Sequence, residues 1–381
     1  MERVIDIKDF KSGSYKKGYQ YRSFSPEKIN HSFYWTDAVI NELLEKAALK
    51  LGELNSFSRF VPDIDMFIMM HITKEAVVSS RIEGTRTNIE EAFSEANEIN
   101  PERRDDWREV NNYVKAINTS IDELRTLPLS SRLLRNAHKM LLSSVRGEHK
   151  NPGEFRRSQN WIGGANLSDA MFVPPFYEEL PELLSDLELF LHNNEISIPH
   201  LIRIAIAHYQ FETIHPFLDG NGRVGRLLIT LYLVANGILE KPLLYLSDFF
   251  EKNKTLYYDN LTLVRAKNDL GQWLKFFLAG VTETAENSIE TLRQITELKT
   301  ALEKHIVGNM GKRSKQGHDF LHLLFKKPVV NMKEVRNMTN LSPKACGDLV
   351  KYFVEHRILV ETTGFQRNRT FVFAEYVKIF R

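Results

Sequence analysis

The chain has 381 residues, of which 43% are hydrophobic and 26% charged, and its formal net charge is +2; this is enough for two or three domains that each bury a core. No apolar run approaches the roughly 18 residues of a membrane span, and the first residues lack an apolar signal core. A single cysteine, Cys346, rules out an intramolecular disulfide, so we expect a cytoplasmic protein without membrane contact.

Helical patterns dominate the first three-quarters of the chain. Residues 1–35 have weak periodicity, and we expect an irregular or partly ordered arm there. Thr36 can cap a helix whose apolar residues recur every three or four positions, and Pro62 can open a second helix that stops near Gly84. Further helical patterns cover 102–124, 130–145, 177–193, the stretch from Ile198 to a break at 215–222, its continuation to about Ala235, and 251–305.

Residues 151–175 interrupt this helical series. A Pro-Gly pair opens the segment, a Gly-Gly pair splits it and a Pro-Pro pair closes it. Phe155 and Trp161 lie on one side of the split, and Met171 and Val173 on the other. The pattern predicts a β-hairpin or ordered flap.

The end of the chain differs in charge and pattern. Residues 308–317 resemble a linker, and the following block suggests helices at 317–326, 332–338 and 343–356 and two strands near 358–361 and 370–373, which is the order of a winged helix. From Lys312 onward the chain has 14 Lys/Arg and 6 Asp/Glu, against 37 and 43 in the remainder. A basic module attracts polyanions such as DNA, although a charge run can also be a solvated face.

The segment 204–233 contains the densest set of reactive side chains. A helix ends near His215, where Pro216 helps to break it, and Gly220 and Gly222 permit a positive φ and close backbone approach. A new helix then begins, and its free N–H groups with the glycines form an anion nest. Arg223 and Arg226 in its first turns oppose the helix dipole, which indicates that an anion is expected there.

Two side chains complete this chemistry. Asp219 beside a phosphate nest suits Mg²⁺, which takes a carboxylate together with phosphate oxygens. His215 is the natural general base.

Three other interpretations compete. Gly220, Gly222 and Gly225 fit the spacing of a dinucleotide fingerprint, with Glu240 about 20 residues on, but that fingerprint follows a strand and here a helix precedes it. Glu212-x-x-His215 imitates a di-iron ligand pair, yet the chain has no second Glu-x-x-His. The third interpretation is that His215 is a structural histidine, hydrogen-bonded before a glycine-rich turn. This does not explain why Asp, Asn and two Arg occur within the same twelve residues.

The twelve residues from His215 to Arg226, HPFLDGNGRVGR, resemble the complete signature of the Fic family, H-x-F-x-D/E-G-N-G-R-x-x-R, with no departure at its eight fixed positions. The resemblance extends to PGEFR at 152–156, to QNWIGG and FVPP in the flap, and to Tyr257-Tyr258, and so covers roughly 60–285. Such proteins mostly transfer AMP to Ser, Thr or Tyr of proteins. A branch that phosphorylates instead has Lys at the position of Gly222.

The resemblance implies a role for each position. His215 takes the proton from the target hydroxyl, Asp219 holds Mg²⁺ against the α- and β-phosphates of ATP, and Arg226 contacts the γ-phosphate. The flap holds the target segment by strand addition, and Tyr257, Tyr258 and Asn253 form the adenine pocket, with core packing as the alternative for the tyrosines. The full set expected to bind nucleotide is Glu83, Gly220, Asn221, Gly222, Arg223, Val224, Gly225, Arg226, Asn253, Tyr257 and Tyr258.

The second helix carries a feature that can restrain this activity. Its apolar stripe at Ile64, Ile68, Ile72 and Ala76 continues to Ser79 and Glu83, which points a hydroxyl and a carboxylate toward the body of the protein unless the helix has run out into solvent. Ser79-x-x-x-Glu83-Gly84 also resembles the inhibitory motif S/T-x-x-x-E-G/N of some Fic proteins. In those proteins the glutamate pairs with the second arginine of the signature, and in some it helps to remove AMP.

We therefore predict a mainly α protein with a Fic-type helical core, a β-hairpin flap and a C-terminal winged-helix domain. The expected parts are an N-terminal helical region with the inhibitory helix (1–100), the catalytic core with its following helices (101–305) and the winged helix (312–381). The predicted function is transfer of AMP from ATP, including self-modification. A homodimer is left open. The rival hypothesis is a DNA-binding regulator whose Fic-like body only senses nucleotide.

Overall fold

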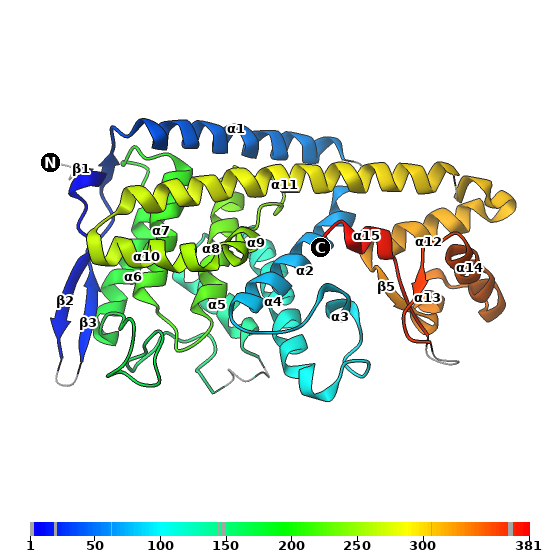
Figure 1. Ribbon diagram of the computed structural model, residues 1–381, viewed down its shortest axis with the longest axis horizontal. Helices are drawn as coiled ribbons and strands as arrows, with labels where there is room; N and C mark the ends of the chain where they lie inside the picture. Colours follow the sequence, from blue (N-terminus) through cyan, green and yellow to red (C-terminus); the bar gives the residue numbers. More distant parts are fainter. Residues whose placement is uncertain are drawn as a thin grey trace.

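The computed structural model describes residues 4–18, 21–61, 63–143, 145, 149–305, 307–364 and 369–381. As predicted, the described chain is mainly helical (Figure 1). Within these residues no helix is both long and apolar enough to cross a membrane.

Two helices form the centre of the molecule. Every residue of α7 (His200–Ile214) after His200 is buried, as are most of α8 (Asn221–Ala235), so α7 is enclosed on all sides and even its polar side chains, such as Glu212, lie in the interior. The helices around this pair are α1 (Ala38–Phe60), α2 (Ile64–Ile82), α3 (Ile89–Phe93), α4 (Arg104–Glu123), α5 (Ser131–Leu141), α6 (Leu180–His192), α9 (Ser247–Lys252), α10 (Lys254–Lys267) and α11 (Leu270–His305).

The helix ends follow the predicted signals to within a few residues. α1 is capped by Asp37, whose side chain accepts a hydrogen bond from the Val39 N–H at 2.9 Å, one residue after the expected Thr36. α2 ends at Ile82, and Gly84 follows with a left-handed φ of 104°, so the predicted glycine stop is confirmed. Pro62, predicted to open this helix, lies outside the described residues. Short 3₁₀ turns are η1 (Ile7–Asp9), η2 (Pro101–Arg103), η3 (Tyr177–Glu179) and η4 (Val307–Arg313).

The N-terminal arm is more ordered than expected. β1 (Val4–Asp6) pairs in parallel with β4 (Ser32–Tyr34), and β2 (Gly13–Lys17) forms an antiparallel hairpin with β3 (Arg22–Pro26). Within it, Phe10, Phe24 and Ile29 are buried. Strands of three to five residues are too short to display a period of two, and tertiary burial of these side chains fixes the arm.

Residues 314–381, the C-terminal module, pack at one end of the long α11 (Figure 1). The module contains α12 (Ser314–Lys326), α13 (Met332–Thr339), α14 (Pro343–Glu355) and α15 (Ala374–Lys378), with a sheet in the order β5 (Val329–Asn331), β7 (Thr370–Val372), β6 (Val360–Glu361). Three helices followed by an antiparallel pair is the expected element order, with β5 as an unpredicted third strand. The assignment to the winged-helix fold remains a prediction, and residues 365–368 of its turn lie outside the described residues.

The predicted linker at 308–317 is wrong. The chain there forms η4 and enters α12 at Ser314, and Val307 is buried. Gly317 lies inside α12, where an added Cβ would collide with Met310 and Val307. This glycine serves close packing rather than flexibility, so the glycine content of the segment does not indicate a flexible connection.

Candidate active site

The loop between α7 and α8, residues 215–220, is shaped by two left-handed residues. His215 ends α7 with φ 50° and ψ 61°, and its N–H donates to the Phe211 carbonyl at 2.9 Å. Gly220 has φ 76° and forms the N-cap of α8. A non-glycine residue in this conformation is uncommon and marks a position held by its surroundings.

The side chain of Asn221 holds the loop closed. Its Oδ1 accepts from the Phe217 N–H and its Nδ2 donates to the Phe217 carbonyl, both at 2.8 Å. Asn221 is 2% exposed. The side chain expected to bind phosphate is thus committed to the loop, which leaves the backbone N–H of Asn221 as its group for an anion at the helix start.

Neighbouring segments fix the loop from behind. His138 of α5 stacks on Phe217 with ring centroids 3.8 Å apart. Its Nδ1 accepts from the Gly153 N–H at 2.8 Å, so its Nε2 carries the proton and donates to the Asp219 carbonyl at 2.9 Å. Asn160 donates to the main-chain oxygens of His215 and Phe217 at 3.2 and 2.8 Å.

His215 has the properties of a proton acceptor. Burial and the nearby Arg156 guanidinium lower the pKa of His215 to about 4, so its imidazole is neutral near pH 7. Its Nδ1 is buried and forms no hydrogen bond with any described residue. A neutral imidazole at the mouth of an anion nest can take a proton without first losing one.

The carboxylate of Asp219 lies beside the start of α8. Its side chain is 48% exposed, and its Oδ1 accepts from the Gly220 N–H at 2.6 Å. Within the described part of the chain, no group of three or more His, Cys, Asp or Glu side chains could hold a metal ion. A cation at Asp219 would therefore need further oxygens from its ligand.

Arg223 links α8 to α4 and to the preceding loop, where its Nη2 lies 3.8 Å from Asp219 Oδ1. Its Nη1 forms an ion pair with Glu109 Oε2 of α4 at 3.1 Å, and the side chains are 4% and 9% exposed. The Arg223 carbonyl accepts from the Tyr113 hydroxyl at 2.9 Å. Its guanidinium thus anchors α8 to α4 in this structure, whereas the resemblance implied phosphate binding.

Arg226 is bound by the end of α2. Its Nε donates to Ser79 Oγ at 2.8 Å, and its Nη2 donates to the Ser79 carbonyl at 2.9 Å and to Glu83 Oε1 at 2.7 Å. The Arg226 side chain is 2% exposed, and that of Glu83 33%. Burial would raise the pKa of Glu83, but Arg226, with Arg223 and His215 nearby, holds it below its ordinary value. Both groups are charged, and the pair that the resemblance to the inhibitory motif implied is present.

The Glu83 carboxylate also lies over the first turn of α8. A Cβ added to Gly222 would collide with Glu83 Oε1 and approach Arg226 Nη1 to 2.9 Å. An anion therefore already occupies the nest that the glycines and helix start create. Lys254 of α10 stabilises the end of α2 by donating to the Ile82 carbonyl at 2.7 Å.

Comparison with known proteins agrees with this geometry. Residues 41–122 match the N-terminal region of the Fic/DOC family, and residues 128–233 match the Fic/DOC family itself. Residues 41–233 belong to the Fic/DOC family.

Curated relatives match part of the chain. The chain is 30% identical over 171 residues to Protein adenylyltransferase Fic of Drosophila erecta, and 35% identical over 136 residues to that of Aedes aegypti. These matches span 45% and 34% of the chain but 31% and 23% of the relatives. The chain thus matches about a third or less of their length.

Solved structures extend the likeness in fold. A Fic family protein from Desulfovibrio desulfuricans G20 aligns with a TM-score of 0.56 at 18% identity, over 89% of this chain and 97% of that one. A Fic domain-containing signalling protein from Bacteroides thetaiotaomicron aligns with a TM-score of 0.50 at 18% identity, over 68% and 97%.

The two tyrosines expected to form the adenine pocket differ in burial. Tyr257 is 1% exposed, stacks on Phe250 and donates its hydroxyl to His208 Nε2 at 2.9 Å, since His208 Nδ1 donates to the Gly225 carbonyl. Tyr258 is 41% exposed, and partial burial and the Glu83 carboxylate raise its pKa to about 12. Of the two tyrosines, Tyr257 is therefore a core residue and Tyr258 has the exposed ring.

Asn253, Val224 and Gly225, which were also expected to bind nucleotide, make packing or backbone contacts within the protein. Asn253 lies between α9 and α10, and its Nδ2 donates to the Phe249 carbonyl at 3.0 Å. Val224 is buried in α8. Gly225 has no room for a side chain, because an added Cβ would collide with the buried Glu212 carboxyl, whose pKa burial raises to about 7.

The predicted flap is a single antiparallel bridge between Ile162 and Phe172. On its outer side the Phe24 N–H of β3 donates to the Val173 carbonyl at 2.9 Å. Trp161 and Met171 are 40% and 86% exposed. Two large apolar side chains are thereby presented to solvent on the flap.

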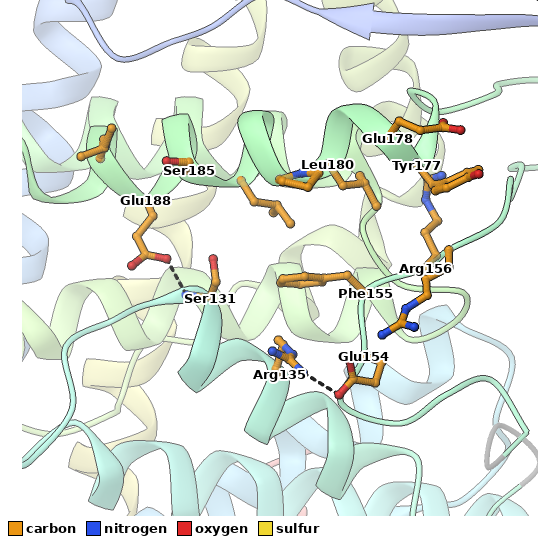
Figure 2. Close-up of a pocket in the computed structure, with 14 residues that line it drawn as sticks. Ser131, Arg135, Glu154, Phe155, Arg156, Tyr177, Glu178, Leu180, Ser185 and Glu188 are labelled. Atoms are coloured by element: carbon orange, nitrogen blue, oxygen red, sulfur yellow. Dashed lines mark hydrogen bonds and ion pairs between the residues drawn. The ribbon is translucent and has the colours of Figure 1, made fainter.

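A separate cleft of about 690 Å³ lies between α5, α6 and residues 154–157. Figure 2 shows Phe155 projecting between the two helices, with Arg135 paired to Glu154 below it and Arg156 at one end. The cleft shares only Arg156 with the surroundings of His215 described above. His138, Asn160, Arg156 and Glu109, which support the loop, were not assigned roles from sequence because their partners are distant in the chain.

Proposed function

We propose that this protein transfers AMP from ATP to the hydroxyl side chain of a Ser, Thr or Tyr in a target protein and releases pyrophosphate, and that Glu83 restrains this activity. The observation that carries the proposal is the Glu83 carboxylate in the nest formed by Gly222, the start of α8 and Arg226. The complete signature and the curated adenylyltransferase relatives support the same reaction.

The reaction follows from the neutral state of His215. The target hydroxyl oxygen attacks the α-phosphorus of ATP, the bond from that phosphorus to the β-phosphate bridging oxygen breaks, and His215 accepts the hydroxyl proton. Little covalent chemistry falls to the protein, so the orientation of the reactants and the neutralisation of phosphate charge account for most of the catalysis.

The phosphates are received by the start of α8. The N–H groups of Asn221 and Gly222 at this helix start would donate to phosphate oxygens, and Arg226 supplies a cation for the γ-phosphate once Glu83 has moved. Asp219, the exposed carboxylate at this position, would hold Mg²⁺, which neutralises phosphate charge when bound. Tyr258 and Asn253 border the space proposed for the adenine.

The Glu83–Arg226 pair explains how the activity is restrained. Arg226 cannot direct the same Nη2 proton to both a carboxylate and a γ-phosphate, and the Glu83 carboxylate repels a phosphate from Gly222. ATP can bind with its phosphates displaced, but then the α-phosphorus does not face His215. Release of Glu83 is therefore a precondition for rapid transfer.

Radiolabelled ATP tests the reaction class. With Mg²⁺ and a cell lysate, ATP labelled at the α-phosphorus should transfer label to protein, and ATP labelled at the γ-phosphorus should not. The same preparation without the enzyme is the control. Protein labelled from the γ position would contradict AMP transfer and indicate a phosphorylating enzyme.

A further inference from the structure

Arg156 lies at the junction of the flap and the catalytic loop. It is 2% exposed, and its guanidinium forms no ion pair with a described residue. Instead Nε donates to the His215 carbonyl at 3.0 Å, and Nη2 donates to the carbonyls of Pro175 and Ile214 at 2.6 and 3.4 Å. Its own N–H donates to the Pro216 carbonyl at 2.9 Å.

Burying a cation that has no carboxylate partner lowers the stability of the fold unless its N–H groups donate hydrogen bonds to other acceptors. The five guanidinium protons allow one side chain to hold several carbonyls at fixed angles. Here those carbonyls belong to the end of α7, the catalytic histidine and the closing end of the flap. Arg135, which lies nearby, donates hydrogen bonds to Gly153 and Glu154 and lies over the Phe155 ring, and among the described residues it forms no hydrogen bond or ion pair with the His215 loop.

We propose that Arg156 is a positioning residue that joins the flap to His215, so that a target segment held by the flap meets the imidazole at the correct distance. This proposal rests on the proposed AMP transfer. Arg156 also places a positive charge near His215, while Glu83 of α2 and Arg265 of α10 are the other charged groups that face the imidazole.

The test uses Arg156→Lys and Arg156→Met in the Glu83→Gly background, with α-labelled ATP as the probe. Both variants should lower the self-labelling rate, Arg156→Met by about 100-fold, with the KM for ATP unchanged. Loss of the charge in Arg156→Met should move the acid limb of the rate to higher pH, whereas Arg156→Lys retains the limb. Arg135→Met is the matched control and should keep the parent rate.

Equal losses in Arg156→Met and Arg135→Met, or losses that follow the melting temperature alone, would overturn the proposal. The parent Glu83→Gly enzyme separates this outcome from failure of the proposed function, because it must first label itself from α-labelled ATP.

A second inference comes from the C-terminal module, which contacts the chain on both sides of Glu83. Before Glu83, Phe325 packs on Phe67 of α2 at 5.5 Å between ring centroids, and Phe380 packs on His71 at 5.1 Å. Phe67, Phe325 and Phe380 are each no more than 2% exposed.

After Glu83, two polar contacts continue the same interface. Arg381 forms an ion pair with Glu90 of α3, and Asn331 Nδ2 donates to Glu98 Oε1 at 3.2 Å. On the opposite side of α2, Ser79 and Glu83 bind Arg226. α2 is therefore packed between the module and the catalytic arginine.

We infer that the C-terminal module is part of the restraint: by fixing α2 and the segment after it, the module keeps Glu83 on Arg226, and loosening the module raises AMP transfer. Since interiors are close-packed, a shift of α2 at Phe67 and His71 moves its C-terminal end as well. This inference also rests on the proposed function.

Reversing charges at the surface can weaken the interface between the C-terminal module and the segment after α2 without creating a cavity in the hydrophobic core. The variant Arg381→Glu with Asn331→Asp places carboxylates opposite Glu90 and Glu98, and Lys378→Glu, at an exposed position on α15, is the control. Self-labelling from α-labelled ATP should rise at least about 5-fold in the double variant and remain unchanged in Lys378→Glu.

Repeating the changes with Glu83→Gly makes the test specific. The double variant should add nothing once Glu83 is absent, because both changes release the same restraint. An unchanged rate in the presence of Glu83, or an equal change in both backgrounds, would overturn the inference. If Glu83→Gly itself does not accelerate labelling, the proposed restraint fails instead.

Discussion

The catalytic loop and the C-terminal module use charge in opposite ways. Around the loop, Arg223, Arg226 and Arg156 are almost fully buried, and each has defined partners. On α14, the charged side chains Lys351, Glu355 and Asp348 are 75%, 57% and 49% exposed, and they pair loosely with one another or with Arg313 at 3.7–3.8 Å.

This difference shows that net charge is a weaker guide to function than the burial of individual charges. The module's excess of basic residues suggested a DNA-binding surface, yet acidic residues alternate with lysines along the exposed side of α14. A buried charge without function is costly to retain, whereas an exposed one costs almost nothing. We therefore expect large effects from changes at the loop and small effects from changes on the module's surface.

The largest effect is expected at the base. His215→Ala should lower AMP transfer by about 10²–10⁴-fold, while ATP binding persists because the nest at α8 is unchanged. The measurement is α-label transfer beside equilibrium ATP binding, and His356→Ala on the module is the matched control. A His215→Ala enzyme that keeps a tenth of the parent rate would show that another group takes the proton.

Removal of the partner of Arg223 should produce the largest loss of stability. Glu109→Ala removes the buried partner of the Arg223 guanidinium and leaves the longer, 3.8 Å pair to the half-exposed Asp219 carboxylate, and we expect the free energy of unfolding to fall by about 3–5 kcal/mol. Denaturant unfolding measures this loss. A fall below about 1 kcal/mol would mean that the pair is no stronger than a surface pair, and the comparison between loop and module would fail.

The pH dependence of transfer tests the state of His215. Because its pKa is lowered to about 4, the neutral base is fully present near neutral pH and is lost only as the pH falls through about 4. The labelling rate of Glu83→Gly should therefore be flat between about pH 5.5 and 8. A decline centred near 6.5, the ordinary histidine value, would indicate an imidazole more exposed than described here.

DNA binding tests the module's surface. In a shift assay with mixed-sequence duplex, we expect no complex at moderate salt, since carboxylates lie among the lysines of α14. Low salt, where nonspecific contacts are strongest, is the permissive condition. A complex that resists moderate salt would revive the regulator hypothesis.

The smallest effect is expected for a single surface charge. Lys351→Ala removes a pair that is mostly exposed, and unfolding free energy should change by less than about 0.5 kcal/mol. AMP transfer should not change. A loss of stability as large as that of Glu109→Ala would show that the Lys351 side chain is packed against another surface rather than exposed to solvent.

The catalytic loop was predictable from sequence because its determinants are local. A proline after a helix, glycines that accept positive φ and a helix start with two arginines all lie within twelve residues. The supporting contacts were not predictable: Arg223 pairs with a residue 114 positions away and His138 reaches the Asp219 carbonyl across 81. Only the folded chain brings such groups together.

The contrast between local and distant determinants also explains which sequence-based predictions differ from the structure. The arm at 4–34 contains strands too short for periodicity, and burial of Phe24 and Phe10 fixes them. The stretch at 308–317 has linker composition, but its glycine at 317 allows close helix packing. The α2 stripe, by contrast, extended a regular period from Ile64 to Glu83 and so predicted the direction of a carboxylate 143 residues from its partner.

The most direct test of the account is the self-labelling rate of Glu83→Gly with α-labelled ATP. Loss of Glu83 frees Arg226 for the γ-phosphate, and we expect the rate to rise about 5–150-fold, equivalent to about 1–3 kcal/mol. The fold should stay intact because Arg226 keeps its hydrogen bonds to Ser79, and labelling should be absent when His215→Ala is added. A folded Glu83→Gly protein that binds ATP and labels no faster than the wild type would contradict the restraint assigned to Glu83.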